Sequence, residues 1–208
     1  MAHPLDAILI AADGALRTLS GSVSPARAAP GERGAVPAAA GDRELAAGLM
    51  RVNHAGEICA QALYSGQAMV ARDAAVRETL EHAGAEERDH LAWCRQRLGE
   101  LEARPSLLDP LWYAGSFALG VASGLAGDRW SLAFLVETER QVEQHLGGHL
   151  EQLPVDDARS RAIVGQMRED EIRHGRSGEA LGANELPRPL KLAMRVFARV
   201  MTRTAYRI

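Results

Sequence analysis

The chain has 208 residues, a length that suits one domain with a tail. Aromatic residues make up only 4% of it, while alanine, leucine, arginine and glutamate are abundant, which favours an all-helical fold over a β-rich one. A net charge of −3 indicates neither a nucleic-acid partner nor an acidic tail, and two cysteines without CxxC spacing indicate reduced thiols. No basic region followed by an apolar run opens the chain, so we expect no secretory signal.

Residues 1–41 are predicted to form an N-terminal extension. Residues 4–20 have a short helical pattern. Gly, Ala, Pro and Ser then dominate residues 21–41, a composition typical of a flexible linker. The next helical pattern starts near Asp42, which we expect to be its N-cap.

Residues 42–186 are predicted to form a bundle of four long helices with a crossover. In the first helix, apolar side chains recur at steps of three, four or seven, and Glu57 lies at the edge of their stripe. In the second, residues 73–102, Glu87 and His90 occupy positions of the apolar stripe itself. Two polar residues at core positions of one helix indicate a site inside the bundle.

An uncharged stretch from Pro110 to Gly127 follows the second helix. Asp109 is its expected N-cap, with proline at the first helical position. The stretch reaches the threshold length of a membrane-spanning helix, but Gly, Ala and Ser dominate it. We therefore expect a crossover or membrane-surface helix, which also supplies the long connection between two antiparallel pairs.

The third bundle helix, residues 129–152, carries three candidate glutamates. Glu139 continues the apolar stripe, whereas Glu143 does not. Glu137 lies roughly 160° away from Glu139 around the helix, so we expect it to face solvent. Only Glu139 is therefore predicted to point into the bundle.

The fourth bundle helix, about residues 155–182, again has two polar residues, Glu171 and His174, on its apolar stripe. The segment after it, residues 187–208, has only positive charges, which lie opposite an apolar stripe. These charges belong to Arg188, Lys191, Arg195, Arg199, Arg203 and Arg207. A basic amphipathic helix of this kind is typical of binding to an anionic membrane surface.

Two Glu-x-x-His strings, residues 87–90 and 171–174, each put a carboxylate and an imidazole on one face of a helical turn. With one glutamate from each of the other two helices, they form the ligand set of a carboxylate-bridged di-metal site. The predicted ligands are Glu57, Glu87, His90, Glu139, Glu171 and His174. Two divalent cations would offset the cost of burying four carboxylates. Few nitrogen ligands among many oxygens favour iron or manganese over structural zinc.

Several other polar side chains are expected near this site. Glu86 and Asp170 directly precede ligand glutamates and are placed to hydrogen-bond a histidine Nδ1. Tyr64 is expected to be a core tyrosine with a satisfied hydroxyl. Three further histidines lie off the central stripes and are given no metal role, although one of them, His145, could approach the periphery of the site. These three are His54, His145 and His149.

The string Arg51-Val52-Asn53-His54-Ala55-Gly56-Glu57, followed by Tyr64-Ser65-Gly66-Gln67, resembles the opening motif of the demethoxyubiquinol hydroxylase family, the di-iron enzymes of ubiquinone biosynthesis. Residues 86–91, 136–139 and 170–174 resemble its remaining ligand motifs in order, and the resemblance covers residues 44–208. It implies a ferritin-like fold and the same six residues as iron ligands, with Glu87 and Glu171 as the bridging pair. His145 also matches a family histidine, but Leu146 stands where many members have tyrosine.

The resemblance implies a di-iron monooxygenase that uses two iron ions per chain and O₂ to hydroxylate the ring of a polyprenylated demethoxybenzoquinol. The family is peripherally membrane-bound, so a membrane surface is an expected partner, at the cytoplasmic face of the inner membrane in a bacterium. Other ubiquinone-biosynthesis proteins and an electron donor are further expected partners. The chain has no Gly-rich nucleotide fingerprint and no ferredoxin-like Cys cluster, so electrons come from a partner or from the quinol itself.

Two alternative functions stay open at this point. One is a di-iron hydroxylase of another substrate, such as a modified tRNA base, which the basic C-terminal segment allows. The other is a ferritin-like protein that stores iron or senses oxygen without a dedicated substrate.

Overall fold

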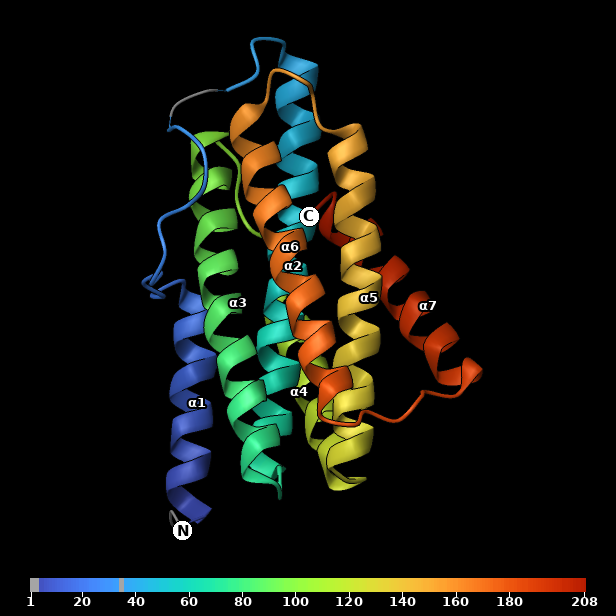
Figure 1. The fold of residues 1–208 in the computed structure, drawn as a ribbon. Coiled ribbons are helices and arrows are strands. Elements are labelled where there is room, and N and C mark those ends of the chain that lie inside the picture. The colour runs from blue at the N-terminus through green and yellow to red at the C-terminus, as the bar shows by residue number, and fades with distance from the viewer. Residues whose placement is uncertain (1–3, 34–35) are drawn as a thin grey trace.

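The computed structural model describes residues 4–33 and 36–208, and within these ranges every regular element is a helix (Figure 1). The prediction of an all-helical, ferritin-like bundle is therefore confirmed. The helices are α1 Pro4–Ser20, α2 Ala40–Val70, α3 Ala74–Glu100, α4 Asp109–Leu125, α5 Asp128–Gln152, α6 Ala158–Ala180 and α7 Arg188–Ala205.

Four of these helices form the bundle: α2 pairs with α3, and α5 pairs with α6. Two apolar clusters of the core lie within the bundle, and a third joins α2 and α3 to α4 and α7. The first bundle cluster includes Met50, Trp93 and Ile163, and the second includes Leu63, Leu80 and Leu135. On α2, α3 and α5 the predicted site residues lie between residues of these two clusters, and on α6 they follow those of the first. The fold thus holds one polar layer between two apolar layers.

Two predicted helix starts are wrong by one or a few residues. Helix α2 begins at Ala40, so Asp42 lies in its first turn and does not cap it. Helix α4 begins at Asp109 itself, after Leu108, and the Asp109 carboxylate instead faces His54, with 3.2 Å between Oδ2 and Nδ1. A tertiary contact has replaced the local cap that the sequence suggested.

Helix α4 forms the predicted crossover between the two antiparallel pairs, and it packs lengthwise against α2. Small residues make this approach possible. A Cβ added to Gly66 would collide with the backbone of Phe117, and one added to Gly120 would collide with the backbone of Leu63. Close packing therefore explains why the stretch is rich in Gly, Ala and Ser. Among the described helices, none has the length and apolar character needed to span a bilayer.

The segment between α1 and α2, predicted to be a linker, packs on the bundle in its described part. The indole Nε1 of Trp93 donates a 3.0 Å hydrogen bond to the carbonyl of Arg27. The Arg159 guanidinium donates to the carbonyl of Ala29 at 3.1 Å. The boundary that separates this segment from the bundle domain at residue 42 stays a prediction.

Helix α7 forms as predicted and runs at an angle to the bundle on the side of α5, where it contacts both α2 and α5 (Figure 1). Because α7 and the loop before it lie on this side, Glu137 is buried, and the expectation that it faces solvent is wrong. The Gln141 amide donates a 2.7 Å hydrogen bond to Glu137, and the Lys191 ammonium lies 3.7 Å from its carboxylate. Glu143, also excluded from the site, is partly exposed and pairs with Arg168.

Candidate metal centre

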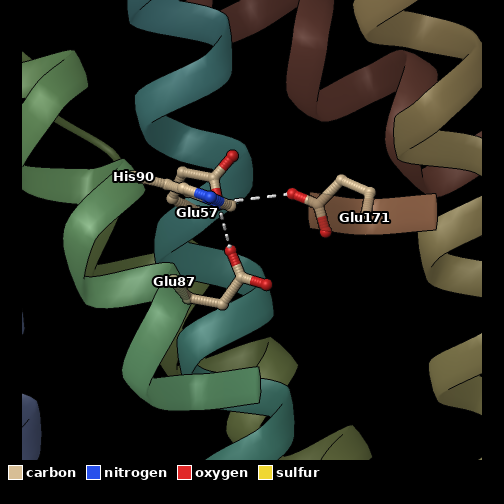
Figure 2. Close-up of side chains that lie close together, drawn as sticks. All are labelled: Glu57, Glu87, His90 and Glu171. Atoms are coloured by element: carbon tan, nitrogen blue, oxygen red, sulfur yellow. Dashed lines mark hydrogen bonds and ion pairs between the residues drawn. The ribbon is translucent and has the colours of Figure 1, made fainter. Parts of the chain in front are cut away.

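The six predicted site residues come together in the polar layer of the bundle. Their side chains form two overlapping groups, within each of which the potential ligand atoms all lie within 4.8 Å of one another. The first group is Glu57, Glu87, His90 and Glu171, and the second is Glu87, Glu139, Glu171 and His174. Figure 2 shows the first group, in which α2, α3 and α6 point their side chains at one another. Glu87 and Glu171 belong to both groups, which is the arrangement of a bridged pair of metals.

The three-residue spacing within each Glu-x-x-His string gives the local geometry. On one turn of α3, the Nδ1 atom of His90 lies 3.0 Å from Glu87 Oε2. On one turn of α6, the Nδ1 atom of His174 lies 3.3 Å from Glu171 Oε2. Because all six residues occupy inward-facing positions, none exposes more than 5% of its surface.

Glu86 and Asp170 orient the imidazoles, but through the other nitrogen and across the helix pair. The Nε2 atom of His90 on α3 lies 2.8 Å from Asp170 Oδ2 on α6. The Nε2 atom of His174 on α6 lies 2.7 Å from Glu86 Oε2 on α3. The prediction that these carboxylates bind Nδ1 is therefore wrong. A proton held on Nε2 leaves the Nδ1 lone pair free to face the centre of the site.

The electrostatics of the layer favour a cation. Burial, together with the charge of neighbouring carboxylates, raises the pKa of Glu57 and Glu139 well above the usual range. Burial alone would lower the pKa of His90, but Glu87 and Asp170 raise it well above its ordinary value. The layer thus holds more negative charge than its two imidazoles can balance.

Two buried oxygen atoms show where added positive charge would fit. The Oε1 atoms of Glu87 and Glu171 accept no hydrogen bond although both are buried. These atoms belong to the two carboxylates that the ligand groups share. Buried carboxylate oxygens normally have donors or metal ions as partners, so this donor set fits divalent cations.

Tyr64 has the satisfied hydroxyl that the sequence predicted. It is fully buried on α2, and its hydroxyl donates a 2.5 Å hydrogen bond to Glu139 Oε1. Burial and the Glu139 charge raise the pKa of this tyrosine well above its usual value. Tyr64 therefore keeps its proton and fixes one carboxylate of the second group.

A cavity of about 340 Å³ lies between α2, α5 and α7 and reaches Glu57. Its lining includes Gly56, His145, Leu146 and Ala198. His145 thus reaches the periphery of the site, as expected, and its Nε2 atom is buried without a hydrogen-bond partner. Burial lowers the pKa of His145 to about 4, so the ring is neutral at pH 7. The other two histidines are elsewhere: His54 faces Asp109, and His149 packs on His145.

Sequence reasoning missed the groups that surround Glu86 and Asp170. Arg27 and Arg173 both contact these two carboxylates, and Asp89 pairs with Arg27. Asp89 lies within the first Glu-x-x-His string, so its acidic character was a visible signal. No periodic pattern could have identified Arg27, because it lies in the segment between helices α1 and α2.

Comparisons with known proteins agree with this site. Residues 44–205 match the family described as ubiquinone biosynthesis protein COQ7. The 3-demethoxyubiquinol 3-hydroxylase of Ralstonia pickettii is 55% identical, over 98% of this chain and all of the relative. That of Bordetella avium is 58% identical over the whole chain and 96% of the relative, and that of Chromobacterium violaceum is 56% identical over 98% of the chain and all of the relative. These similarities extend into the segment before residue 44.

Proposed function

This chain belongs to the ubiquinone biosynthesis protein COQ7 family, and we propose that it uses two iron ions and O₂ to hydroxylate the ring of a polyprenylated demethoxybenzoquinol. Its full-length relatives are named 3-demethoxyubiquinol 3-hydroxylase, which supports hydroxylation of this quinol in ubiquinone biosynthesis. The observation that carries the di-iron assignment is the pair of ligand groups that share Glu87 and Glu171.

In this proposal Glu57 and His90 would hold one iron, Glu139 and His174 would hold the other, and Glu87 and Glu171, which belong to both ligand groups, would serve both. A ligand set of four carboxylates and two imidazoles suits iron or manganese better than structural zinc. The bound metal pair supplies the activation of O₂ that ring hydroxylation needs. Hydrogen bonds from Tyr64 to Glu139 and from the imidazoles to Asp170 and Glu86 keep the ligands in place.

The cavity beside Glu57 is the proposed position of the quinol ring. Val52, Val142 and Met201 give it apolar walls, while the unpartnered Nε2 of His145 can hydrogen-bond a ring hydroxyl. Leu146 lines the same cavity and offers no hydroxyl, so no phenol at this position passes a proton or an electron. Electrons then come from a partner or from the quinol itself.

Helix α7 is proposed to lie on the membrane surface above this cavity, which would let the isoprenoid tail stay in lipid. Its apolar side chains Leu192, Val196 and Val200 are exposed, and its arginines flank them. Phe197 of α7 makes an edge-to-face contact with Trp112 of α4, with ring centroids 5.8 Å apart. Leu111 and Leu119 of α4 are exposed as well, and we propose that they belong to the same face. In a bacterium we expect this face to contact the cytoplasmic side of the inner membrane.

Quinone profiling tests the proposed reaction. A strain that lacks this gene should accumulate a demethoxy quinol intermediate and lose ubiquinone, and expression of the intact chain should reverse both changes. Normal ubiquinone in the deletion strain would contradict the proposal. Accumulation of an under-modified tRNA instead would favour the alternative hydroxylase, although the names of the relatives favour the quinol.

A further inference from the structure

Residues 26–31, called the strap from here on, join the N-terminal segment to α3 and α6. The backbone N–H of Ala26 donates a 2.6 Å hydrogen bond to Asp89 Oδ1 on α3. Trp93, also on α3, donates to the carbonyl of Arg27, and Arg159 on α6 donates to the carbonyl of Ala29. Both bundle pairs are thus bound to the same short stretch of backbone.

The strap carries one side chain, Arg27, that reaches toward the candidate centre. Its Nε lies 2.7 Å from Asp89 Oδ2, and its Nη1 lies 2.9 Å from Asp170 Oδ2. The same Nη1 lies 3.6 Å from Glu86 Oε1. The guanidinium also lies over the Trp93 ring, 4.9 Å from its centroid, a cation–π geometry. Contacts on three sides fix the orientation of this planar group.

Two of the carboxylates that Arg27 contacts are those that hold the site imidazoles. Asp170 accepts from His90, and Glu86 accepts from His174. One guanidinium from outside the bundle therefore touches the outer partner of both metal-facing histidines. Arg173 on α6 contacts the same two carboxylates, at 2.5 Å from Asp170 and 3.0 Å from Glu86. Two guanidinium groups and three carboxylates, Asp89 included, thus form a cluster of ion pairs behind the imidazoles.

We propose that Arg27 is a positioning residue of the metal centre, which acts through Asp170 and Glu86 to fix the direction of both histidine Nδ1 lone pairs. This inference rests on the proposed function, because it takes the six-residue layer to be the iron site. Arg27 touches no predicted ligand itself. The N-terminal segment, predicted from sequence to be only a linker, thereby becomes part of the support of the centre.

Removing the guanidinium should weaken metal binding without removing a ligand. Loss of an outer partner of a ligating histidine typically lowers metal affinity about 10- to 100-fold. Arg27 supports these partners from one step further out, and Arg173 still contacts both carboxylates, so we expect Arg27→Gln to show only the lower end of that range. Loss of a nearby positive charge should also lower the reduction potential of bound iron, since the oxidised form becomes easier to hold.

The test uses the full-length chain, stripped of metal and titrated anaerobically with Fe²⁺, and then a redox titration of the loaded protein. Arg27→Gln is expected to bind Fe²⁺ about tenfold more weakly and to show a lower potential. Arg27→Lys keeps the charge but not the planar fork, so the potential should return toward wild type while the affinity recovers only in part. Arg33→Gln changes an exposed arginine just after the strap and is the matched control, expected to leave both values unchanged.

If Arg27→Gln binds Fe²⁺ with the affinity and reduction potential of wild type, this inference is overturned but the proposed function is not. If the Gln variant does not fold, an Arg27→Lys protein with an unchanged affinity would overturn the inference equally. A wild-type chain that binds no iron would overturn the proposed function, and this inference with it.

Discussion

The two sides of the metal centre are built differently. Behind the imidazoles, on the α3–α6 side, charged groups and the strap close the site: Glu86 and Asp170 are held between Arg27 and Arg173. On the α2–α5 side, a cavity lined by Gly56, His145 and residues of α7 leads to Glu57. The closed side fixes the ligands, whereas the open side leaves room for a substrate. This difference explains why a single polar layer can be both rigid and accessible, and it gives four predictions that test one side against the other.

The largest effect is expected from the shared carboxylates at the middle of the layer. Glu171→Ala should lose bound iron and hydroxylation together, because this carboxylate belongs to both ligand groups. The loss of iron affinity should exceed the 10- to 100-fold that is typical when a residue that hydrogen-bonds a metal ligand is removed. Iron analysis and mass spectrometry of the quinol product measure it. Glu143→Ala, which changes a partly exposed glutamate paired with Arg168, should keep both. Full activity in Glu171→Ala would refute the site.

The open side should tolerate changes that leave the iron in place but block the substrate. A Cβ added to Gly56 meets nothing within 4 Å, and Gly56 lines the cavity, so we expect the side chain of Gly56→Leu to occupy part of the cavity. We expect unchanged iron content, a KM raised about tenfold or more, and a slightly higher stability, because leucine is the better helix former by about 1 kcal/mol. Gly99→Leu, at an exposed position far along α3, should leave KM unchanged. An unaltered KM in Gly56→Leu would place the substrate elsewhere.

The proposed membrane face should depend on exposed side chains of α7. Leu192→Glu combined with Val196→Glu replaces two exposed apolar residues and leaves the buried Met201 contact intact. Burial of such side chains in lipid is worth roughly 1.5–3 kcal/mol each, so binding to anionic liposomes should fall at least about tenfold. Val155→Glu, an exposed apolar residue outside α7, is the control. Equal sedimentation of both variants with liposomes would refute the membrane role.

The last of the four effects is on stability and concerns acidification of the open side. Burial lowers the pKa of His145 to about 4 and that of His149 to about 3, whereas in the unfolded chain both titrate near 6.5. On acidification the unfolded state takes up protons first, so their contribution to stability is complete above about pH 6.5 and is lost toward pH 4. Between pH 7 and pH 5 the free energy of unfolding, measured in urea, should fall by about 2 kcal/mol less in His145→Gln than in wild type.

Acid also releases bound metal, which lowers the stability of every variant. The comparison therefore needs a second histidine variant that loses metal in the same way. His82→Gln changes an exposed histidine on α3 whose Nδ1 lies 3.7 Å from Glu86, a contact worth at most about 1 kcal/mol at the surface, and should otherwise follow wild type at both pH values. If His145→Gln loses as much stability as His82→Gln, then His145 does not resist protonation in the fold.

The middle of the layer could be predicted from sequence because its residues obey helix periodicity. Glu57, Glu139 and the two Glu-x-x-His strings lie on or beside apolar stripes, and any antiparallel bundle of these helices brings such positions together. The cavity wall could be predicted only in part: the periphery was expected at His145, but the opening next to Gly56 depends on where α7 crosses.

The closed side could not be predicted in the same way. Asp170 could bind a histidine of its own helix or of α3, and through either ring nitrogen. The outcome depends on how far α3 and α6 are shifted along their axes relative to each other, which the pattern of a single helix does not define. Glu137 is buried because α7 covers it, a contact between elements that no helical wheel contains. Arg27 lies in a segment without periodicity, and its importance appears only when the strap is seen against α3.

The proposed centre would hold two iron ions, with Glu87 and Glu171 serving both. Mössbauer spectroscopy of the full-length protein loaded with ⁵⁷Fe tests it most directly, together with iron analysis of the same sample. Two irons per chain that couple to each other magnetically are the predicted result. One iron per chain, or two that behave as isolated ions, would contradict the account.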